Sequence, residues 1–150
     1  MNGDGVSASV QMQRVTFKSR TRELVIALVV VIGLVSYNIT IPKGRTRSKN
    51  WNFVLTHPTI LIHIIVGSLV LIGAVALLLR SVHSRVRSWI VVSGIGLTFV
   101  IIAFAMGEQY VSTLSNTDLS DMGLGWFGAI AAYGVGWYLS RASKSSTEAT

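Results

Sequence analysis

The chain has 150 residues, of which 51% are hydrophobic, and it carries a net charge of +7. A soluble domain of this length cannot bury so much apolar side chain in separated runs of about eighteen residues or more, so the composition indicates an integral membrane protein. The absence of cysteine excludes disulfides, thiolate metal sites, iron–sulfur clusters and cysteine nucleophiles.

The amino-terminal part combines a polar segment with a first apolar run. Residues 1–23 are polar and form a cytoplasmic segment that ends in a basic stretch at 14–22. The apolar run 24–41 is longer than the core of a usual signal peptide, and no small-residue cleavage site follows it. We therefore expect a retained transmembrane helix that ends at Pro42, which cannot continue a helix.

The second apolar run, 58–79, is the one around which the chain is organised. It has no formal charge and a single histidine, His63. A helix of this length reaches about 33 Å, enough to cross the apolar core of a bilayer. The basic stretch 43–57 before it is predicted to be a loop with Trp51 at the membrane interface, and Pro58 suits the first turn of the following helix.

Two further apolar runs complete the pattern. The short basic connection 80–88 makes the run 89–107 an antiparallel neighbour of the second span. The loop 108–121 carries three acidic residues and no basic one. The fourth span, 122–139, is rich in glycine and aromatic residues. The sequence thus predicts an all-α membrane protein with a four-helix transmembrane domain over 24–140.

The distribution of Lys and Arg predicts the orientation. Nine of them flank the spans on the side of the two termini and the second loop, against four on the other side. Both ends of this antiparallel bundle, including the polar tail 141–150, are therefore predicted to be cytoplasmic. The basic first loop is expected to lie beside the acidic third loop, which brings Arg45, Arg47 and Lys49 close to Glu108, Asp118 and Asp121.

Small residues recur at four-residue spacing on three of the spans. Lipid gives helices no hydrophobic reason to associate, so small residues that let two backbones approach favour packing. These faces are expected to point inward, within the monomer or toward another chain. The predicted helix-packing residues are Gly67, Ala103, Gly107, Gly128, Ala132 and Gly136.

His63 is the residue most suggestive of chemistry, because an ionisable side chain within a membrane segment is costly to keep there. One alternative is a haem b ligated by His63 and Met106. Another is a metal ion held by His63 and Glu108, and a third is a quinone head group. Small membrane cytochromes usually ligate haem through a pair of histidines on two helices, and such a pair is missing from these spans. A neutral imidazole that is hydrogen-bonded to a neighbouring helix also accounts for His63.

No motif of a catalytic site occurs, and the short loops leave no room for a soluble type of active site. We therefore expect the protein to have neither enzymatic activity nor a resident cofactor. Its expected role is that of an accessory or structural subunit of a larger membrane complex. The alternatives are a haem-, metal- or quinone-binding protein centred on His63 and an oligomeric channel or small transporter. The expected setting is a prokaryotic cell membrane crossed several times. The expected partners are anionic headgroups and other membrane subunits or copies of this chain, with no nucleic acid.

Overall fold

A computed structural model describes residues 19, 21–30, 41 and 46–145, with the side chains of 140–145 excepted. This part of the chain is helical and has no strand. Residues 21–30 form one helical segment. The other helices are α2 (Arg47–Thr56), α3 (Pro58–Ser84), α4 (Arg87–Thr113) and α5 (Asn116–Ser145).

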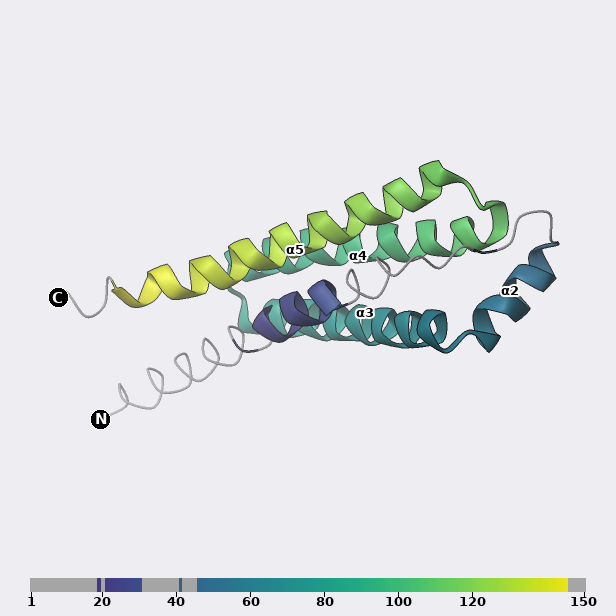
Figure 1. Ribbon diagram of the computed structural model, residues 1–150. Coiled ribbons are helices and arrows are strands. Elements are labelled where there is room, and N and C mark those ends of the chain that lie inside the picture. Colours follow the sequence, from purple (N-terminus) through teal and green to yellow (C-terminus); the bar gives the residue numbers. More distant parts are fainter. Residues whose placement is uncertain (1–18, 20, 31–40, 42–45, 146–150) are drawn as a thin grey trace, which may run out of the picture.

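The three long helices lie alongside one another and alternate in direction (Figure 1). Arg85, which ends α3, and Leu114, which ends α4, both adopt the left-handed conformation, with φ of 57° and 55°. This conformation reverses the chain within a few residues but is strained for a residue with a Cβ. The turns therefore place α3 beside α4 and α4 beside α5, and the most extensive pairing among the helices α2 to α5 is that of α4 with α5.

The second, third and fourth predicted spans fall inside α3, α4 and α5, and these helices are longer than the spans. Pro58 occupies the first turn of α3 after the extended residue His57, as predicted. The third span continues as helix to Thr113. The region 43–57 differs from the prediction: instead of a loop throughout, it contains the ten-residue helix α2. Of the first predicted span, only residues 24–30 and 41 are among those described.

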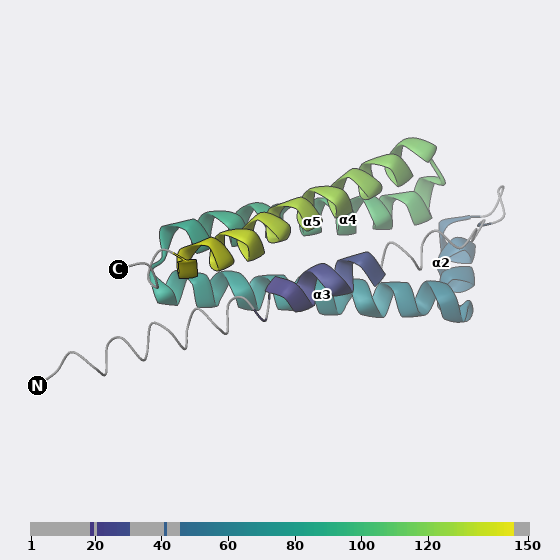
Figure 2. The same ribbon diagram turned by 60° about the vertical axis from the view of Figure 1, so that its left-hand side comes forward.

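The segment 21–30 packs between α3 and α5 (Figures 1 and 2). A methyl group added at Gly73 of α3 would lie 3.1 Å from Leu24, and one at Gly136 of α5 would lie 3.7 Å from Thr21. Thr21, Leu24 and Leu28 are buried. This segment thus contributes a fourth element to the hydrophobic core.

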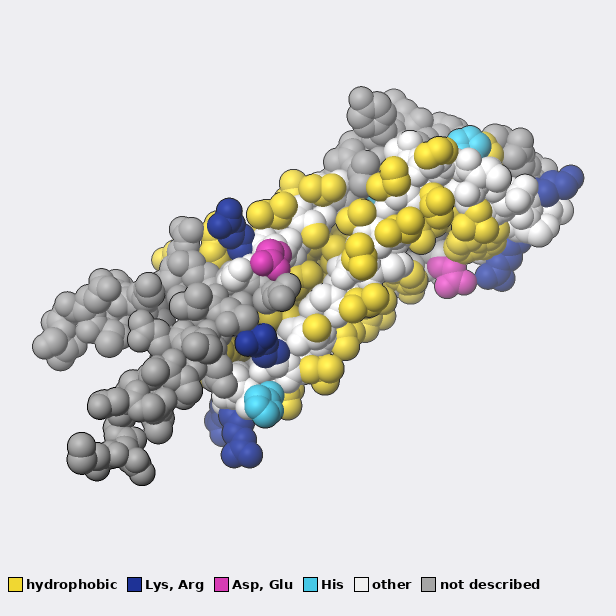
Figure 3. All heavy atoms as spheres, turned by 90° about the horizontal axis from the view of Figure 1, so that it is seen from below, with side chains coloured by type: hydrophobic (Ala, Val, Ile, Leu, Met, Phe, Trp, Pro, Cys, Tyr) yellow, Lys and Arg dark blue, Asp and Glu magenta, His cyan; other side chains and the backbone are white. Residues whose placement is uncertain are grey.

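The outward faces of the bundle are also apolar. Among the described residues, α3 and α4 are long and apolar enough to cross a membrane, and only 22% and 28% of their most apolar stretches are buried. A helix in the core of a soluble protein hides most of such a stretch. Figure 3 shows hydrophobic side chains over the middle of one face, with basic side chains toward both ends.

Candidate functional site

Glycines bring α4 and α5 into close contact, and this packing fixes the interior of the bundle. A Cβ at Gly125 would lie 2.8 Å from both the backbone nitrogen and the Cβ of Ala103. Phe99 lies over Gly128, and Tyr133 lies over Gly96 at 2.5 Å from a Cβ there. Aromatic rings thus occupy the space that the missing side chains leave.

The six predicted helix-packing residues are all buried or partly buried in the structure. Gly67 is buried and faces Trp126, while a Cβ at Gly107 would lie 3.2 Å from the sulfur of Met122. Gly136 is buried against Val92. Ala103 is buried, Gly128 faces Phe99 and Ala132 is partly buried.

Gly96 and Gly125 were not among the packing residues predicted from the sequence. Gly125 begins a buried stripe on α5 that continues through Ala129 and Tyr133 at intervals of four residues. That spacing was visible, but the chain contains 14 glycines, which offer several such stripes. Only the packing shows which stripe faces α4.

His63 lies in the first half of α3 and is half-buried. Its ring centroid is 6.4 Å from that of Trp126, with the two rings nearly perpendicular at 77°. The same indole lies 3.9 Å from the position of a Cβ at Gly67, one turn farther along α3. The absence of a side chain at Gly67 therefore admits Trp126 beside His63, and this edge-on contact is a favourable aromatic arrangement.

Two buried polar atoms on α5 have no hydrogen-bond partner within the part of the chain that the structure describes. They are Nε1 of Trp126 and the hydroxyl oxygen of Tyr133. The two residues are 3% and 0% exposed and, seven positions apart, share one face of α5. Buried polar groups are normally satisfied, so within the described part of the chain these two atoms have an unmet capacity for a hydrogen bond.

The other predicted ligands lie in different surroundings. Met106 is partly buried and packs against the main hydrophobic cluster, which includes Trp126. Glu108 is exposed and pairs with Arg47 of α2 at 3.4 Å. Within residues 19, 21–30, 41 and 46–145, no group of three or more His, Asp or Glu side chains is arranged to hold a metal ion. The pairing of His63 with Met106 or Glu108 stays a prediction.

The Arg47–Glu108 pair is one of the contacts expected between the first and third loops. Both side chains are more than half exposed, so the pair adds little stability, about 0–1 kcal/mol. Asp118 instead accepts a hydrogen bond from the hydroxyl of Thr113. Arg45 lies outside the described residues.

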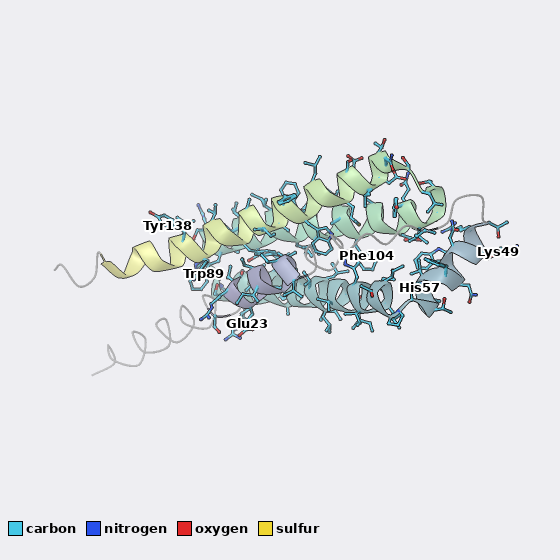
Figure 4. The ribbon with its side chains drawn as sticks, viewed as in Figure 1. Glu23, Lys49, His57, Trp89, Phe104 and Tyr138 are labelled. Atoms are coloured by element: carbon cyan, nitrogen blue, oxygen red, sulfur yellow. The ribbon has the colours of Figure 1, made fainter. Side chains whose placement is uncertain are left out.

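A buried asparagine fastens α2 to the bundle. Asn50 is 1% exposed and donates from Nδ2 to the carbonyl of Val111 at 3.0 Å. Val54 on the next turn of α2 packs with Val111 in a small hydrophobic cluster. This end of the bundle, where Figure 4 labels Lys49 and His57, is therefore covered by a docked helix.

A serine pair joins α3 to α4 near the opposite end. The hydroxyls of Ser81 and Ser93 are 2.9 Å apart, and Ser81 also donates to the carbonyl of Leu77. Both serines are fully buried. Such a bond satisfies polar groups in an apolar interior and fixes the register of the two helices.

Comparisons with protein-family models, with curated proteins and with solved structures find no match for this chain. The class that the structure defines is an all-helical protein with two candidate membrane-spanning helices.

Proposed function

We propose that the chain crosses a membrane four times, with both termini in the cytoplasm, as an integral protein of a prokaryotic cell membrane. The first span begins at residue 24 and the fourth lies in α5, so that both accompany α3 and α4. The packing of segment 21–30 against Gly73 and Gly136 supports this arrangement. All four elements expose large apolar side chains, which lipid can cover.

Its role in this proposal is that of an accessory or structural subunit, without a catalytic site of its own. The observation that carries the proposal is the filled interior: Phe99, Trp126 and Tyr133 lie where glycines make room. A bundle packed in this way offers its outer faces for interaction. A larger membrane protein, or a second copy of this chain, would cover part of the exposed apolar surface.

Site-specific photo-crosslinking in native membranes tests this role. A photoreactive residue is placed at Leu69 of α3, Ile95 of α4 or Phe127 of α5, all exposed, with buried Val70 as the matched control. The proposal predicts a discrete protein adduct in high yield from one of these faces and none from Val70. Lipid adducts alone at all three exposed positions would contradict a subunit role.

A second candidate is a small membrane protein that binds haem, a metal ion or a quinone beside His63. The buried Trp126 Nε1, which has no hydrogen-bond partner among the described residues, favours it because a polar ligand could accept that bond.

Visible absorbance, metal analysis and quinone extraction of the protein purified in mild detergent, beside His63→Ala, test this candidate. A Soret band, stoichiometric metal or stoichiometric quinone that disappears in the variant would establish ligand binding. A colourless protein without metal or quinone, with an equally well-folded variant, would exclude it.

A further inference from the structure

The end of α3, the turn that follows it and the start of α4 carry a group of basic side chains. Arg80, His83, Arg85 and Arg87 are all exposed, and we call them the basic turn. No acidic residue occurs between Glu23 and Glu108, so neither helix contributes a negative charge near this turn. Arginine side chains that are not neutralised locally favour a phosphate or another anion.

One acidic side chain does lie toward this end of the described part. Figure 4 labels Glu23 near Trp89, the buried residue in the first turn of α4. The carboxylate of Glu23 accepts a hydrogen bond from Ser19 at 3.1 Å, and Arg22 precedes it in the chain. A single carboxylate leaves the basic turn with an excess of positive charge.

An exposed apolar stripe on α3 leads directly to the basic turn. Its side chains follow one another at three- or four-residue intervals, so consecutive members are neighbours on the surface of the helix. Each is 40% exposed or more. The stripe consists of Leu69, Ile72, Val75, Leu79 and Val82.

We propose that the basic turn and this stripe together bind an anionic phospholipid, with the phosphate at Arg80, Arg85 and Arg87 and an acyl chain along α3. The proposal rests on the membrane placement argued above and adds the lipid class and its position. Positive charge at one end and apolar surface along the adjoining helix match the two parts of such a lipid. A soluble phosphate would use the charges but not the stripe.

Because the chain has no cysteine, one fluorophore can report on one position. Labelled Val82→Cys lies beside the basic turn, and labelled Ile62→Cys lies near the opposite end of α3; both positions are exposed. Each variant is reconstituted in phosphatidylcholine bilayers that contain either brominated phosphatidylglycerol or brominated phosphatidylcholine at the same fraction. Bromine quenches the fluorophore only at close range, so quenching reports the lipid next to the label.

We expect phosphatidylglycerol to be enriched at least about fivefold over phosphatidylcholine at position 82, because fivefold corresponds to about 1 kcal/mol, the attraction of a single basic residue to an anionic surface, and the basic turn has three arginines. We expect no such preference at position 62. The combined substitutions Arg80→Gln, Arg85→Gln and Arg87→Gln should abolish the preference at 82, whereas Arg47→Gln with Lys49→Gln should preserve it.

Equal quenching by the two lipids at position 82, or a preference that survives the triple substitution, would overturn the lipid site while leaving the membrane placement intact. Quenching by neither lipid at either position would show that α3 does not lie in the bilayer. That result would overturn the proposed membrane placement and the lipid site with it.

Discussion

The contact of Gly125 with Ala103 makes a sharp prediction about how α4 and α5 are held together. In Gly125→Ala the new methyl group would lie 2.8 Å from the backbone nitrogen of Ala103, and a helix backbone cannot rotate away as a side chain can. Overpacking of this kind costs about 1–3 kcal/mol. Gly134→Ala is the matched control on the same helix, because nothing lies within 4 Å of a Cβ there.

Both substitutions gain the same intrinsic helix propensity, up to about 1 kcal/mol, so the difference between them isolates the packing cost. We expect Gly125→Ala to be about 1–3 kcal/mol less stable than Gly134→Ala. Gly128→Ala should fall between the two, because its obstacle is the side chain of Phe99. Reversible unfolding in mixed micelles, followed by tryptophan fluorescence, measures the free energies. Equal stability of Gly125→Ala and Gly134→Ala would refute the close approach of α4 and α5.

Three further predictions concern single contacts. Asn50→Ala should lower the free energy of unfolding by about 1 kcal/mol and speed hydrogen exchange within α2, because it removes the hydrogen bond to α4. Substitution of the exposed neighbour, Asn52→Ala, should leave exchange unchanged. Equal effects of the two substitutions would contradict the anchoring role of Asn50. In a double-mutant cycle of unfolding free energies, Ser81→Ala and Ser93→Ala should show a coupling energy of about 0.6 kcal/mol. Additive effects would mean that the two hydroxyls do not interact. Arg85→Gly should raise the free energy of unfolding by about 1 kcal/mol, because glycine adopts the left-handed conformation without strain. A loss of stability would argue against the left-handed turn between α3 and α4.

Hydrophobic runs predicted the long helices well because each run is continuous and bounded by clear signals. Pro58 marks the start of α3, and the charged connection 80–88 marks the junction with α4. The helix α2 escaped prediction because its sequence mixes basic, polar and aromatic residues without a clear apolar face. Its docking depends on buried Asn50, whose partner lies 61 residues away in the sequence.

The surroundings of the candidate site depended on tertiary packing and were harder to predict. The sequence identified His63 as an unusual residue for a span, but nothing in its neighbourhood indicated Trp126, which comes from another helix. Likewise Glu108, considered as a metal ligand, pairs with Arg47. The predicted topology does not fix the direction in which a side chain turns around its helix, so it does not establish which side chains meet.

The most direct test of the account is the membrane topology of single cysteines in intact cells, since the chain has none of its own. Ser88→Cys lies at the start of α4, and Thr117→Cys lies at the start of α5; both positions are exposed. For a four-span bundle with both termini in the cytoplasm, we expect a membrane-impermeant maleimide to label position 117 at once and position 88 only after the membrane is permeabilised. Labelling of both positions from outside would contradict a membrane-spanning α4, and labelling of 88 alone would reverse the proposed orientation.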